Sequence, residues 1–249
     1  AWADELGVET FVGSSGRVFP KAMKASPLLR AWRARLEAAG VSILTRHRFV
    51  GFSDGQAVID TPDSRRTIAA DAFLLAFGGA SWPRLGSDAG WVSKLSNLGV
   101  DIADFRPANC GFDRDWNPAF VDRFAGEAIK SVAATSEAGR SQGEFVITGH
   151  GVEGSLIYAH AANLRDCIER EGNATLTLDL VPDRDVNRLA RDIARQNAKS
   201  SFSNRLRKAT GLHGVKAALL RECVPDAPHF TPEKLASTIK ALPLVLDRP

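Results

Sequence analysis

The run Ala72–Phe77, which ends in Gly78-Gly79, constrains the fold of this chain more than any other segment. It reads AFLLAF and contains no charged or polar side chain. A continuous apolar run of this length that stops at paired glycines predicts a strand buried on both faces, as in parallel sheets. Open α/β sheets bind ligands at the carboxyl ends of their strands. Gly78 and Gly79 therefore predict either a place where a ligand approaches bare backbone or a tight turn without a ligand.

Composition excludes several classes of function. The chain has 249 residues, of which 44% are hydrophobic and 24% are charged, as in a soluble protein of one large or two small domains. Its net charge is only +3, with Lys and Arg among acids, so we expect no nucleic-acid partner. The longest uncharged run, Ala72–Pro83, is too short to span a bilayer, and no signal peptide is visible. We therefore expect no membrane partner and a cytoplasmic location.

The cysteines and histidines indicate no metal site. Cys110, Cys167 and Cys223 are far apart and form no CxxC pair, which argues against a zinc site or a disulfide framework and favours a reducing compartment. The five histidines show no HxH or HExxH spacing. His150, between two glycines, is a weak candidate for an acid–base group, and an ordinary loop histidine is the alternative. Cys110 is interpreted as a small core residue or as a group that faces a substrate cavity.

Local patterns predict a mixed order of helices and strands. Ser26 as N-cap, Pro27 in the first turn and Gly40 as the stop predict a helix, followed by a strand at Val41–Leu44. An antiparallel meander is predicted from Phe49–Phe52, Ala57–Asp60 and Thr67–Ala70. Later strands are predicted near Lys130–Ser136, Glu144–Thr148, Ala174–Leu180 and Leu242–Leu246, with one helix over Ser155–Glu171 and several after Pro182. Thr231-Pro232-Glu233 marks the start of the last helix.

The segment Gly149–Gly154 satisfies the GxGxxG pattern of dinucleotide sites. A predicted strand precedes it, a helix follows it, and Asp179 ends the next strand. Against a nucleotide site, Glu153 would place a carboxylate where the pyrophosphate should lie. Tyr158 is also bulky for close packing of a helix on a strand. We favour a glycine pattern without a nucleotide and expect its strand to belong to an antiparallel or mixed sheet.

Several long motifs in order resemble one flavoprotein family. The AFGGASWPRLGS run resembles the second glycine motif of two-dinucleotide-binding flavoproteins. Four further segments are similar to the same family: Gly13–Trp32, Arg106–Phe112, Gly149–Asp183 and Ser203–Glu222. Together they resemble the BaiN/YhiN-like family of NAD(P)/FAD-dependent oxidoreductases, whose members are mostly uncharacterised. The resemblance covers nearly the whole chain.

The resemblance implies an α/β fold with an α+β insert. A partial FAD/NAD(P)-binding doubly wound domain with the meander would span residues 1–106, and a β-rich insert domain residues 107–181. A small helical subdomain would span residues 182–249, with a final strand that returns to the insert. The family's N-terminal GxGxxG and its C-terminal FAD-binding segment are not found in this sequence. It is therefore expected to be the central portion of a larger flavoprotein, inactive alone and binding FAD weakly or not at all.

The resemblance also implies a reaction and a set of contacts with FAD. Hydride would pass from NAD(P)H through FAD to a small-molecule substrate that the residues do not identify. The cofactor-binding residues would be Gly16, Arg17, Val18, Phe19 and Pro20 beside the isoalloxazine, with Gly78, Gly79, Ala80, Ser81, Pro83 and Gly86 in the glycine motif. Two alternatives stay open: an NAD(P)-binding dehydrogenase that uses Gly149–Gly154, and a non-catalytic excised domain without a cofactor. The oligomeric state is unknown from the sequence.

Overall fold

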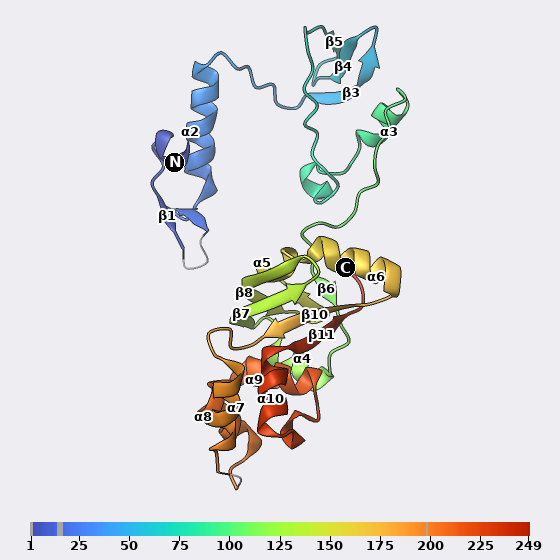
Figure 1. The fold of residues 1–249 in the computed structure, drawn as a ribbon. Helices are drawn as coiled ribbons and strands as arrows, with labels where there is room; N and C mark the ends of the chain where they lie inside the picture. The colour runs from blue at the N-terminus through green and yellow to red at the C-terminus, as the bar shows by residue number, and fades with distance from the viewer. Residues whose placement is uncertain (1, 14–16, 198) are drawn as a thin grey trace. The chain divides into compact units, whose positions relative to one another are not determined.

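The chain divides into two compact units. The structure is a computed structural model that describes residues 2–13, 17–197 and 199–249 (Figure 1). Unit 1 comprises residues 1–105 and unit 2 residues 106–249. The finer division of the second half into an insert at 107–181 and a helical subdomain at 182–249 stays a prediction.

Unit 1 is built from short elements. They are α1 (Trp2–Glu5), β1 (Thr10–Val12), β2 (Val18–Pro20), α2 (Ala25–Ala38), β3 (Arg48–Ser53), β4 (Gln56–Asp60), β5 (Arg65–Ile68), the 3-10 helix η1 (Pro83–Leu85) and α3 (Val92–Ser96). The predicted meander is confirmed, because β3, β4 and β5 pair antiparallel in that order. The predicted cap of α2 is wrong: Lys24 is the N-cap residue and bonds no backbone N–H through its side chain. Ser26 and Pro27 instead lie inside the first turn, where the missing N–H of proline is tolerated.

The predicted buried strand at Ala72–Phe77 is not formed. The segment is irregular, and the side chain of Leu74 is 94% exposed. Its rings pack on the meander, with Phe77 stacked on Phe49 at 4.7 Å between centroids. No described strand pairs with this segment, so its backbone has no ladder of hydrogen bonds to hold it as a strand. Val41–Leu44, also predicted as a strand, is irregular and exposed, and no described strand pairs with it.

Unit 2 contains a six-stranded sheet and most of the helices. Its strands are β6 (Phe112–Asp113), β7 (Ala128–Ser136), β8 (Gly139–Ile147), β9 (Gly151–Glu153), β10 (Ala174–Asp179) and β11 (Leu242–Leu246). Its helices are α4 (Pro118–Phe124), α5 (Ser155–Tyr158), α6 (Ala161–Glu171), α7 (Val186–Ala194), α8 (Phe202–Thr210), α9 (Gly214–Cys223), the 3-10 helix η2 (Ala227–His229) and α10 (Pro232–Lys240). The start of α10 is confirmed, because the Thr231 side chain accepts a hydrogen bond from the Lys234 N–H.

The sheet of unit 2 is antiparallel throughout and closes on itself. Its strand order is β11-β10-β7-β8-β9-β6. A bridge between Asp113 in β6 and Arg248, just after β11, joins the two outer strands of that order. The predicted return of the chain through β11 is confirmed, since Leu242, Leu244 and Leu246 are fully buried on one face of that strand. Nearly all buried apolar side chains of the described residues lie in this unit.

The single helix predicted over Ser155–Glu171 is interrupted at Ala159 and His160. The His160 side chain is 2% exposed, and its two ring nitrogens lie 2.8 Å from Ser136 Oγ and 2.6 Å from Ser141 Oγ. These serines belong to β7 and β8, so the histidine fixes the helix break against the hairpin. In Figure 1, α5 and α6 lie at one end of the sheet and α7 to α10 gather at the other. No described helix combines the length and the apolar character that a bilayer crossing requires.

Candidate functional site

The first predicted flavin-contact segment forms half of a hairpin. The Gly13 N–H donates to the Arg17 carbonyl at 2.7 Å, and β1 pairs antiparallel with β2. The rings of Phe11 and Phe19 face each other across this pair, 5.8 Å apart. Val18 is 62% exposed, so one face of β2 is open to a ligand. Gly16, predicted as part of this segment, lies outside the described residues.

The second predicted segment, Gly78–Gly86, forms a folded loop. The Ala89 N–H donates to the Gly79 carbonyl at 3.1 Å, and the Trp91 indole N–H donates to the Gly78 carbonyl at 3.1 Å. Trp82 and Ser87 exchange two backbone hydrogen bonds around η1, and Gly86 ends that helix in the left-handed conformation. The prediction that the glycines follow a strand is therefore wrong, whereas the turn after them is present.

The backbone at Gly78–Ser81 is open to close approach. Its four successive N–H groups donate no hydrogen bond to any described residue. A Cβ added at Gly79 would meet only the Phe105 ring, at 3.8 Å, and one added at Gly86 would meet nothing within 4 Å. Such a row of free donors suits the oxygen atoms of a phosphate or a flavin ring. Ser81 and Pro83 are exposed beside it.

The structure does not bring the two predicted segments together. No described hydrogen bond or ring contact links Val18–Pro20 to Gly78–Gly86. The loop instead packs within unit 1 through Phe77 and Trp91, whose rings lie 6.1 Å apart. The shared flavin site therefore stays a prediction.

Two of the three glycines in Gly149–Gly154, Gly151 and Gly154, are explained by strand packing. A Cβ at Gly151 in β9 would lie 1.9 Å from the Phe112 carbonyl oxygen of the facing strand β6. Gly154 has a φ of 114°, and its Cβ would lie 3.2 Å from the Phe145 Cα. β8, which precedes the glycines, pairs antiparallel with both of its neighbours. The expectation that this strand belongs to an antiparallel sheet is thus confirmed.

Asp179, the acidic residue of the dehydrogenase alternative, has other partners. Its carboxylate lies 2.7 Å from Lys240 Nζ and accepts the Val181 N–H at 3.0 Å. The carboxylate therefore holds the turn after β10. Nothing in this arrangement favours a ribose contact.

His150 and Cys110 occupy different surroundings. His150 is exposed, and its backbone carbonyl accepts the Arg114 N–H at 2.8 Å. It lines a cavity of about 400 Å³ together with Trp116 and Asp247. Cys110 packs partly buried against the core, and burial raises the pKa of its thiol. The core interpretation of Cys110 is favoured, because a protonated thiol is a poor nucleophile.

Sequence reasoning missed the two partly buried serines that flank the buried His160, and the lysines around the turn after β10. Neither group has a characteristic spacing: Ser136, Ser141 and His160 meet only because a hairpin and a helix break are packed together. Burial lowers the pKa of His160, so the imidazole is held neutral. Among the described residues, no group of three or more His, Cys, Asp or Glu is arranged to hold a metal ion.

The comparison with known families concerns unit 2. A family model described as HI0933-like protein barrel and H2TH domain matches residues 106–249, more than half of the chain. The closed sheet of β6 to β11 and the helices gathered beside it agree with that description. The match supports the resemblance noted in the sequence. The chain belongs to the HI0933/BaiN/YhiN flavoprotein-like family.

Proposed function

We propose that the protein acts in a flavin-dependent oxidoreductase that passes hydride from NAD(P)H through FAD to a small organic substrate. The observation that carries this proposal is the family match over residues 106–249. The alternative dehydrogenase site at Gly149–Gly154 receives no support, because close strand packing accounts for Gly151 and Gly154. The donor, the substrate and a cytoplasmic location are part of the proposal.

The residues of the Gly78–Ser81 loop fit an FAD molecule. Their N–H groups are unpaired within the described residues; only the Phe105 ring lies near Gly79, at van der Waals distance from an added Cβ, and nothing lies within 4 Å of one at Gly86. FAD, when bound, supplies the electron transfer itself. The loop would bind FAD oxygen atoms through its N–H groups, and Val18 and Phe19 would cover a face of the ring and exclude water.

Purification of the natural protein that carries this sequence tests the proposal. We expect a bound flavin in its absorption spectrum and loss of that spectrum when NADH or NADPH is added without oxygen. Gly79→Val should weaken FAD binding roughly tenfold or more, because a bulky side chain would block the loop N–H groups. Gly149→Val is the control for the same substitution outside the loop, since an added Cβ at Gly149 meets nothing within 4 Å.

Two results would contradict the proposal. The first is a wild-type protein that takes up no flavin even after incubation with excess FAD. The second is equal FAD affinity in the Gly79→Val and Gly149→Val variants, which would separate the flavin from this loop.

A further inference from the structure

A second cavity is lined wholly by residues of unit 2. Its volume is about 550 Å³, within the range of small-molecule sites. Three parts of the chain form its walls: β7 near Lys130 and Ser131, the turn after β10 at residues 180–184, and residues 210–216, which run from the end of α8 into the start of α9. Val181, Pro182 and Val215 give it an apolar part between the polar groups.

Lys216 is the cation that spans this cavity. Its ammonium group donates to the Ser131 carbonyl and to the Leu180 carbonyl, both at 3.2 Å, and so ties two walls together. An ammonium group has three donors, and the third has no partner among the described residues. Burial lowers the pKa of Lys216, while the nearby Asp179 charge opposes that effect. A half-buried cation with a free donor stabilises an anionic oxygen placed beside it.

An irregularity in β7 builds one of the walls. The pairing of β7 with β8 shifts register between Ile129 and Val132, so Lys130 and Ser131 bulge out of the ladder. Ser131 has a φ of 52°, in the left-handed region. Bulges of this kind redirect groups out of a sheet. Here the bulge turns the Ser131 carbonyl to Lys216 and leaves Lys130 on the cavity wall.

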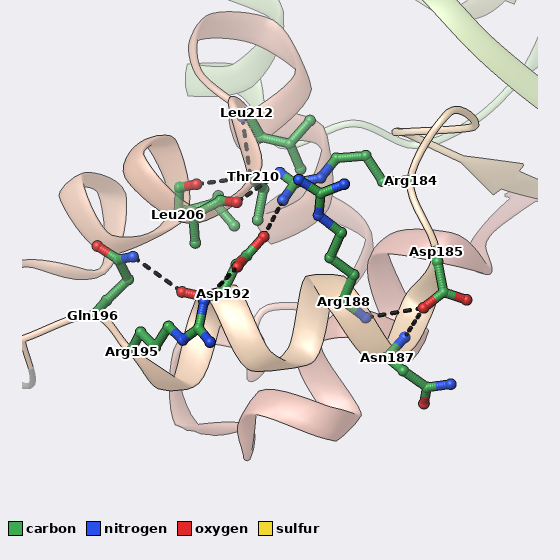
Figure 2. Close-up of polar contacts among 11 residues, drawn as sticks. Arg184, Asp185, Asn187, Arg188, Asp192, Arg195, Gln196, Leu206, Thr210 and Leu212 are labelled. Carbon is green, nitrogen blue, oxygen red and sulfur yellow. Dashed lines mark hydrogen bonds and ion pairs between the residues drawn. The ribbon is translucent and has the colours of Figure 1, made fainter.

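The other charged groups of the cavity are paired or exposed. Arg184 donates to the Ala209 carbonyl at 2.6 Å and to the Asp192 carboxylate at 2.5 Å, so Asp192 neutralises it (Figure 2). Lys130, Glu127 and Asp183 are exposed, where water screens their charges. Lys216 is therefore the charge best placed to select a ligand.

We propose that this cavity binds a small organic anion, with a carboxylate or phosphate group on Lys216 and an apolar body against Val181, Pro182 and Val215. The ligand class follows from one half-buried ammonium group with a free donor, placed beside apolar side chains in a cavity whose other charged groups are paired or exposed. The proposal does not depend on flavin binding.

Lysine acylation of the intact wild-type protein tests the proposal without a mutation. Benzoate and inorganic phosphate are the probes, with sodium chloride at equal ionic strength as the reference. Acetic anhydride labelling, read by peptide mass spectrometry, should show Lys216 protected severalfold by a probe. Lys240 is the internal control, because it bonds the Val181 and Pro182 carbonyls from outside the cavity lining and should be unaffected.

Variants then assign the site. Saturable amide shifts in NMR titrations should occur at Ser131, Val181 and Lys216, and Lys216→Met should weaken binding roughly tenfold or more. Lys240→Met should retain binding, which controls for loosening of the turn. Protection by benzoate but not phosphate would assign a carboxylate, and the reverse a phosphate. Equal labelling of Lys216 with and without both probes would overturn the proposal, as would unchanged affinity in a folded Lys216→Met variant.

Discussion

Replacing Gly151 by alanine should destabilise unit 2, because the new Cβ would lie 1.9 Å from the Phe112 carbonyl oxygen. Both groups belong to backbone, so β6 and β9 must separate by about 1 Å before the contact is acceptable. Separation weakens the Trp116 indole hydrogen bond to the Gly151 carbonyl, which is 3.1 Å long, and the pairing of the two strands. It also begins to expose Phe112 and Val152, which are 2% and 1% exposed.

The expected loss is about 3 kcal/mol in the free energy of unfolding. Two weakened hydrogen bonds contribute about 1 kcal/mol each, and partial exposure of two apolar side chains contributes about 1 kcal/mol more. Gly149→Ala is the matched control: its Cβ would meet nothing within 4 Å, so its effect should stay within about 0.5 kcal/mol.

Urea unfolding followed by hydrogen exchange of β10 peptides measures this difference in unit 2 alone. β10 is suited to the measurement because β11 and β7 pair with it on both sides. Equal unfolding midpoints for Gly151→Ala and Gly149→Ala would refute the packing argument. NADH binding lost in Gly149→Ala would restore the nucleotide interpretation.

Three further predictions concern other parts of the chain. Amide hydrogens of Ala72–Phe77 should exchange roughly a hundredfold faster than those of Ala174–Asp179, because only the latter lie in a sheet with backbone hydrogen bonds. Equal protection of the two segments, measured by mass spectrometry, would contradict the irregular conformation of Ala72–Phe77. As pH falls below the ordinary His160 pKa of 6.5, the unfolded chain takes up a proton before the folded one, so the free energy of unfolding should fall until the lowered folded pKa is passed. His160→Gln should remove that slope in urea titrations, and an unchanged slope would assign it elsewhere. Asp185→Ala should cost about 1 kcal/mol, because the carboxylate caps α7 at the Asn187 and Arg188 N–H groups (Figure 2), whereas Asp185→Asn should be nearly neutral in thermal unfolding.

Local chemistry made much of unit 2 predictable. Alternation at Leu242–Leu246 identified a strand with one apolar face, and the structure buries that face completely. Thr231 and Pro232 identified the start of α10, because a hydroxyl cap and a proline in the first turn act within four residues. Alternation and helix caps depend only on residues close together in the sequence, so they can be recognised in a single sequence.

Features that depend on distant partners were not predictable. Ala72–Phe77 has the composition of a buried strand, but composition cannot provide a pairing strand, and Leu74 is exposed. The contact of Lys216 with Ser131 joins residues 85 positions apart and needs a bulge in β7 that no residue pattern announces. For the predicted flavin contacts, the residue pattern indicated the turn at Gly78–Gly86, whereas the unpaired N–H groups of that turn depend on its three-dimensional conformation.

The backbone pairing of Asp113 with Arg248 brings the two ends of unit 2 together. The Asp113 N–H donates to the Arg248 carbonyl at 2.7 Å, and the Asp113 carbonyl accepts the Asp247 N–H at 2.9 Å. Asp113 and Arg248 are 135 positions apart in the sequence. The polypeptide thus enters and leaves the closed sheet at neighbouring points. A surface loop of another protein can open by a few ångströms to receive such a module, with little effect on either hydrophobic core. In folding, the same join closes the longest loop of the unit, which places it among the last contacts to form.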